Sequence, residues 1–130
     1  MITRGFRGQS LIVGLMVFAT GTFAVASLVH SGVVIALGPV TIDDQLNGAM
    51  IPEAIIAIVL GIGSIAVIIR GAAGRPLAWA TTLFALLGTL FGLTVTVRSS
   101  RTGDVAYHVA ILLVLVVILG LLLSTRGKSN

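Results

Sequence analysis

The hydrophobic positions of this chain form long runs, and the charged residues stand at the ends of those runs. No Asp, Glu, Lys or Arg occurs within residues 8–42, 54–69, 76–97 or 105–125. A helix of about 20 apolar residues is long enough to cross the hydrocarbon core of a bilayer. The runs therefore predict four transmembrane helices, at about residues 9–31, 49–70, 77–98 and 105–124.

The connectors left between these runs are short, which favours an up-down antiparallel bundle. No soluble domain fits between the spans, so residues 1–130 are predicted to form a single domain. In the first connector, Gly38 and Pro39 mark a break, and Thr41 and Asp44 have the spacing of a capping box in which Asp replaces the usual Glu or Gln. This spacing predicts either that the second helix begins near Ile42, with Thr41 as its N-cap, or that a short interfacial helix at about 42–48 precedes the second span. Pro52 is compatible with the first turn of that span.

Composition supports lipid as the main solvent of the folded chain. Hydrophobic residues make up 57% of the sequence and charged residues only 9%, whereas soluble domains carry roughly 25% charged residues. The sequence contains no cysteine, which excludes disulfides, thiolate metal sites and cysteine nucleophiles. We therefore expect an all-α integral membrane protein.

The basic residues are unevenly distributed between the two ends of the predicted spans. With four spans, both termini lie on one side of the membrane, together with Arg4, Arg7, Arg70, Arg75, Arg126 and Lys128. Arg98 and Arg101 lie on the other side. The positive-inside rule then places both termini in the cytoplasm. These residues are scattered in ones and twos, which favours a topology signal over a nucleic-acid surface. The richness in Ala, Gly, Val and Leu and the use of Arg over Lys are typical of a high-GC bacterium, so we expect the membrane to be the bacterial inner membrane.

All the acidic residues and both histidines fall at the predicted outer side. Carboxylates and imidazoles are ligands that zinc or manganese accepts. Asp104 and His108 are four residues apart and share one helix face. The cluster is therefore a candidate divalent-metal site, with these possible ligands: His30, Asp43, Asp44, Glu53, Asp104 and His108.

Other interpretations of the same residues stay open. Acidic side chains at helix N-termini complement the helix dipole, with Asp104 as N-cap of the fourth helix and Glu53 in the first turn of the second. Arg98 and Arg101 could pair with the acids instead of a metal. A haem between His30 and His108 is a further alternative.

Small residues recur at helical spacing in the second and third spans. In lipid, such residues let helix backbones approach closely. They predict packing within one bundle or an interface with a partner protein or a second copy, through Ala57, Gly61, Gly88, Gly92 and Thr96.

The predicted spans hold no charged residue at mid-depth, where ion-coupled transporters usually carry one. The sequence also lacks a nucleophile elbow, an HExxH motif and a glycine-rich phosphate loop. We therefore expect a non-catalytic accessory or structural subunit that associates with other membrane proteins or with itself, without a cofactor. A small channel or transporter formed by oligomerisation is the alternative, and an outer-face metal or ligand binder is the third.

Overall fold

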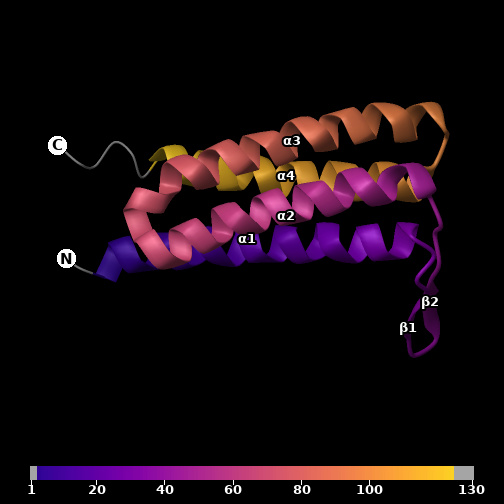
Figure 1. The fold of residues 1–130 in the computed structure, drawn as a ribbon, viewed down its shortest axis with the longest axis horizontal. Helices are drawn as coiled ribbons and strands as arrows, with labels where there is room; N and C mark the ends of the chain where they lie inside the picture. Colours follow the sequence, from indigo (N-terminus) through magenta and orange to yellow (C-terminus); the bar gives the residue numbers. More distant parts are fainter. Residues whose placement is uncertain (1–2, 125–130) are drawn as a thin grey trace.

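The helices of this protein lie side by side in a single bundle. The computed structural model describes residues 3–124. In chain order, the elements are α1 (Thr3–His30), β1 (Ile35–Leu37), β2 (Val40–Ile42), α2 (Asn47–Arg70), the 3-10 helix η1 (Gly71–Gly74), α3 (Arg75–Arg98) and α4 (Thr102–Ser124). Successive helices run in opposite directions, so α1 begins and α4 ends at the same end of the bundle (Figure 1). We call the opposite end, where the β-hairpin lies, the hairpin end.

The helical class predicted from the apolar runs is confirmed. Three stretches of the described residues are long and apolar enough to cross a membrane: Gly8–His30, Gly48–Arg98 and Thr102–Ser124. The middle stretch comprises α2, η1 and α3. The helices are somewhat longer than the predicted spans, because each continues into the flanking polar residues.

The predicted interfacial helix at 42–48 is wrong. Residues 35–42 form an antiparallel hairpin in which Ile35 pairs with Ile42, and Leu37 with Val40. Gly38 has a φ of +62°, which suits the first central position of a type II′ turn, where glycine is favoured. Thr41 therefore belongs to β2, and α2 begins only at Asn47. A local capping pattern was outweighed by strand pairing across a two-residue turn.

The interior of the bundle is filled by apolar side chains from all the helices. Met16, Phe23, Leu60, Leu115 and Ile118 are fully or almost fully buried. Large apolar side chains also cover the outside: Ile69 is 75% exposed, Phe91 69% and Leu113 64%. An exterior of this kind is typical of a helix bundle surrounded by hydrocarbon rather than water.

Candidate metal centre

The candidate site lies at the hairpin end, where four segments of the chain meet. His30 comes from the last turn of α1, Asp44 from the segment after β2, Glu53 from α2, and Asp104 from the first turn of α4. His30, Glu53 and Asp104 are buried, with 5%, 4% and 8% of their surfaces exposed. Buried groups of this kind require partners, and each of these three side chains has at least one.

The end of α1 places His30 in a defined position. Gly32 has a φ of +95°, its N–H donates to the carbonyl of Val29 over 2.9 Å, and the N–H of Val33 donates to Leu28 over 3.1 Å. These bonds form a Schellman motif, which ends the helix at His30. The carbonyl of His30 then accepts a hydrogen bond of 3.1 Å from the N–H of Leu46. The segment that carries Asp44 is thereby tied back to the end of α1.

The imidazole of His30 is held by Glu53. Nδ1 of His30 lies 2.6 Å from Oε2 of Glu53, and both side chains are buried. An ionised Glu53 accepts a hydrogen bond from Nδ1–H, which leaves the lone pair on Nε2. A second bond joins the same two helices one turn earlier, where the Ser27 hydroxyl donates to the Met50 carbonyl over 2.8 Å. The orientation of the ring therefore follows from the packing of α1 on α2.

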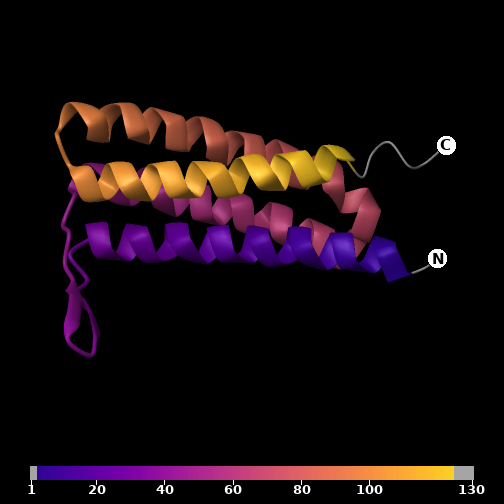
Figure 2. The same cartoon turned by 180° about the vertical axis from the view of Figure 1, so that it is seen from behind.

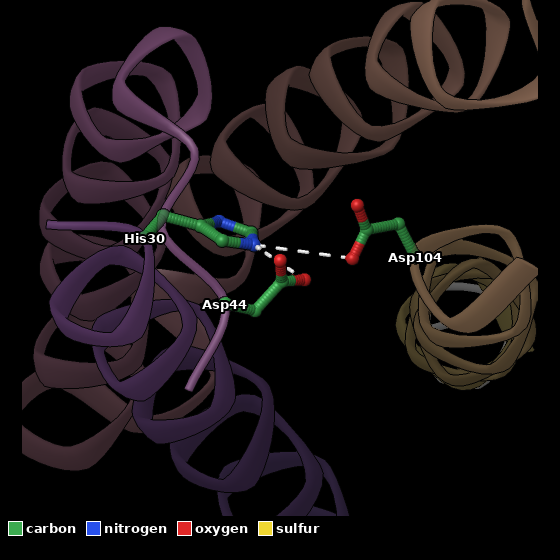
Figure 3. A group of neighbouring side chains, drawn as sticks. All are labelled: His30, Asp44 and Asp104. Atoms are coloured by element: carbon green, nitrogen blue, oxygen red, sulfur yellow. Dashed lines mark ion pairs between the residues drawn. The ribbon is translucent and has the colours of Figure 1, made fainter. Parts of the chain in front are cut away.

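The free nitrogen of His30 faces two carboxylates, as Figure 3 shows. Nε2 lies 3.9 Å from Oδ2 of Asp44 and 3.9 Å from Oδ1 of Asp104. One donor atom from each of the three side chains lies within 4.8 Å of the other two. His30, Asp44 and Asp104 therefore present three metal-ligand atoms to a common point, which we call the triad.

Arg101 orients both carboxylates of the triad. Its Nε donates to Oδ2 of Asp104 over 2.6 Å, and its Nη2 donates to Oδ1 of Asp44. Each carboxylate thus gives one oxygen to the guanidinium and turns the other toward His30. The pairing of Arg101 with the acids was an alternative to a metal site in the sequence. In the structure, the pairing of Arg101 with the two carboxylates is compatible with a metal site.

The remaining predicted ligands lie outside the triad. Asp43 is exposed and joins none of the ion pairs described within residues 3–124. Nδ1 of His108 donates to the backbone carbonyl of Asp104 over 2.7 Å, and its ring lies against Gly92, where an added Cβ would be 2.6 Å from Nε2. Neither residue contributes a donor atom to the point faced by His30.

Two predicted roles at helix starts are also wrong. Asp104 is not the N-cap of α4, because the helix begins at Thr102 and Asp104 lies inside the first turn. Glu53 does not lie in the first turn of α2, because this helix begins at Asn47. Both helices start earlier than their apolar runs, so these acids lie deeper in the bundle than the sequence suggested.

Tyr107 of α4 was not among the candidate site residues predicted from the sequence. Its ring packs edge-on against Phe23 and His108, with centroid separations of 6.4 Å and 5.2 Å. Among residues 3–124, neither its buried hydroxyl nor Oε1 of Glu53 has a hydrogen-bond partner. Buried polar atoms without a protein partner are those that ordered water usually satisfies.

The triad forms the polar end of a groove beside α1. The groove has a volume of about 610 Å³ and is otherwise lined mostly by apolar side chains of α1, such as Val17, Val25 and Val29, with Tyr107 contributed by α4. Ile42 of the hairpin also lines it.

The small residues singled out in the sequence lie along the contacts between helices. A Cβ added at Gly88 would lie 2.8 Å from Ile56, and one added at Gly61 would lie 3.5 Å from Thr20. Ala57 and Thr96 are buried within the bundle. These positions pack against other helices of the same chain, and their use in binding a partner stays a prediction.

Comparisons with known proteins provide no relative for this chain. The sequence matches no family model, and neither the curated proteins nor the solved structures yield a match. Function must therefore be inferred from the side chains themselves.

Proposed function

We propose that this protein crosses a bacterial inner membrane four times, with both termini in the cytoplasm, and binds a divalent cation at its outer end. The proposed topology makes α1 to α4 the four spans and places the hairpin end outside. The apolar exterior of the bundle and the concentration of basic residues at the opposite end support this arrangement. The role proposed for the bound ion is structural rather than catalytic.

One observation carries the cation proposal. The three side chains of the triad converge through atoms that their own partners leave free, with Glu53 behind His30 and Arg101 behind both carboxylates. Metal-binding histidines commonly donate their second ring N–H to a carboxylate, and ligating carboxylates are also held by hydrogen bonds. The triad has such a partner for every ligand.

The charge balance favours a divalent ion. If Asp44, Asp104 and Glu53 are all ionised and the imidazole of His30 is neutral, the single guanidinium leaves two negative charges uncompensated. Uncompensated charge is costly in a largely buried site. A divalent cation would neutralise this excess, whereas protonation of His30 would remove only half of it.

The donor atoms of the triad, which lie within 4.8 Å of one another, must move closer together to hold an ion. Donor atoms of a tetrahedral site with metal–ligand bonds of about 2.1 Å lie about 3.4 Å apart. The separations from Nε2 to the two carboxylates are 3.9 Å. Asp44 lies in a segment without helix or strand structure, so its carboxylate can make this approach. One imidazole and two carboxylates suit zinc or manganese, and leave at least one coordination position for water.

The test is cation binding by the purified, full-length protein. After treatment with a chelator in mild detergent, zinc and manganese are titrated separately by calorimetry, and the bound metal is measured by elemental analysis. We expect one ion per chain, with affinity at least about 10-fold lower in Asp44→Asn and Asp104→Asn. Asp43→Asn is the matched control, because it removes the same charge from the adjacent, exposed position. Absence of saturable binding, or equal losses in Asp43→Asn and Asp44→Asn, would refute the proposal.

A further inference from the structure

The β-hairpin leaves the bundle sideways at the hairpin end. In Figures 1 and 2, it projects away from α1, across the direction of the helix axes. Residues 31–42 contain no charged side chain. In the proposed topology, an arm with this direction runs along the surface of the membrane rather than into the water above it.

The strand register gives the hairpin two unlike faces. Residues directly opposite each other in an antiparallel pair share a face, and successive residues alternate between faces. The pairs Ile35–Ile42 and Leu37–Val40 therefore lie on one face, which we call the apolar hairpin face, and the pair Ala36–Thr41 lies on the other. The apolar face carries the large side chains, and the opposite face carries a methyl group and a hydroxyl-bearing side chain.

The apolar hairpin face is largely uncovered. Leu37 is 63% exposed, Val40 56% and Ile42 41%. Both strands are also edge strands, because the sheet contains only these two. A short hairpin with exposed apolar residues and free edges is marginally stable and prone to self-association in water.

Ile42 shows which way this face is turned. Its side chain lines the groove that follows α1, together with Val25 and Val29. The apolar hairpin face is therefore continuous with the side of α1 that the proposed topology exposes to hydrocarbon. The apolar stretch of α1, Gly8–His30, has 23 residues and a length of about 34 Å. Since the hydrocarbon core is about 30 Å thick, His30 and the start of the hairpin lie near its edge.

We propose that the hairpin is a membrane-interface anchor, with Ile35, Leu37, Val40 and Ile42 resting on the lipids of the outer leaflet. This proposal rests on the four-span topology, and it is independent of cation binding. The occupant of the apolar face is lipid, because the face is uncharged, lies across the helix axes and continues a lipid-side surface. The anchor would also affect the position of Asp44, because Asp44 follows Ile42 by two residues.

Tryptophan fluorescence in reconstituted vesicles tests the anchor. The single native tryptophan is first removed by Trp79→Phe, and one new tryptophan is then introduced by Leu37→Trp, Val40→Trp or Thr41→Trp. The vesicles contain phosphatidylcholine and phosphatidylglycerol, with or without brominated acyl chains. We expect blue-shifted emission and strong quenching by brominated lipid for Leu37→Trp and Val40→Trp. Thr41→Trp, on the opposite face, should be quenched mainly by aqueous acrylamide.

A fourth variant separates failure of the anchor from failure of the topology. Leu113 lies in the middle of α4 and is 64% exposed, so Leu113→Trp should be quenched by brominated lipid if the bundle spans the bilayer. Quenching of Leu113→Trp together with acrylamide quenching of Leu37→Trp and Val40→Trp would overturn the anchor alone. If Leu37→Trp and Val40→Trp are protected from both quenchers, the anchor would also be overturned, because the apolar hairpin face would then be covered by protein. Circular dichroism of each variant checks that the bundle is intact.

Discussion

The imidazole of His30 and the carboxylate of Glu53 form a buried pair, with Nδ1 and Oε2 2.6 Å apart. The pair joins the last turn of α1 to α2, and it sets the rotation of the ring that faces Asp44 and Asp104. Because a carboxylate behind a metal-binding histidine orients the ring, Glu53 would contribute to the proposed cation site without touching the ion.

Glu53→Gln should weaken cation binding while leaving the bundle folded. Glutamine retains an acceptor oxygen but loses the negative charge that favours the Nδ1–H form of His30. We expect a fall in affinity of about 10- to 100-fold, as is typical when such a partner is removed. Calorimetric titration with zinc measures the change, and Asp43→Asn again controls for the loss of one acidic charge. An unchanged affinity in a folded Glu53→Gln variant would show that the pair only joins the helices.

Arg101→Lys should also weaken binding, although it preserves the charge. A guanidinium presents several N–H groups in a fixed plane, whereas an ammonium is a point charge. Lysine therefore cannot reproduce the bridge between Asp44 and Asp104. Arg98→Lys is the matched control, since Arg98 is an exposed residue at the end of α3. A higher affinity in Arg101→Lys would identify the arginine as a competitor of the ion rather than as an orienting residue.

Cation affinity should fall as the solution is acidified. The sign follows from competition: the metal binds neutral imidazole and ionised carboxylates, so protons displace it. Titrations at several pH values in buffers that do not bind zinc measure this dependence. The dependence of affinity on pH should be weaker in His30→Gln than in the wild-type protein. An affinity that does not change with pH in the wild-type protein would argue against His30 as a ligand.

Gly74→Ala should destabilise the corner between α2 and α3. An added Cβ at Gly74 would lie 2.1 Å from the carbonyl oxygen of Ala66, a backbone atom that cannot move alone. We expect a loss of about 1–3 kcal/mol, the usual cost of overpacking. Gly61→Ala is the control, because its Cβ would meet Thr20 at an ordinary 3.5 Å. Thermal unfolding in detergent should give a lower melting temperature for Gly74→Ala than for Gly61→Ala. Equal melting temperatures would contradict the close approach of Gly74 to the backbone of Ala66.

The absence of native cysteine permits a direct test of topology. With single substitutions Asp43→Cys and Ser124→Cys, a membrane-impermeant maleimide should label only the first in intact spheroplasts. Permeabilisation should expose the second. Labelling of Ser124→Cys alone before permeabilisation would reverse the proposed orientation, and labelling of both variants would contradict an even number of spans.

The helices could be predicted from the sequence because charge-free runs are long and unambiguous. Val40, Thr41 and Ile42 were harder to interpret, since Thr41 and Asp44 also have the spacing of a helix cap. The two-residue turn at Gly38 and Pro39, flanked by branched apolar residues, was the signal that could have indicated a hairpin. The cap pattern covers only residues 41–44, whereas the pairing of β2 depends on residues 35–37 of the preceding strand.

The composition of the candidate site was only partly predictable. The sequence indicated that acids and histidines gather at one end, and the structure brings His30, Asp44 and Asp104 together there. The sequence could not show that Asp44 rather than Asp43 belongs to the triad, because that depends on the direction of the chain after β2. The rotation of His108 toward Gly92 was equally hidden, since it follows from how α3 packs on α4.

The uneven exposure of the site has a consequence for exchange kinetics. The side chains of His30 and Asp104 are 6% and 10% exposed, whereas those of Asp44 and Arg101 are 37% and 31% exposed. A cation would therefore arrive and depart on the side of Asp44 and Arg101. Its residence time would depend on how often the segment carrying Asp44 moves away from α1, a motion limited by the hydrogen bond from Leu46 to His30.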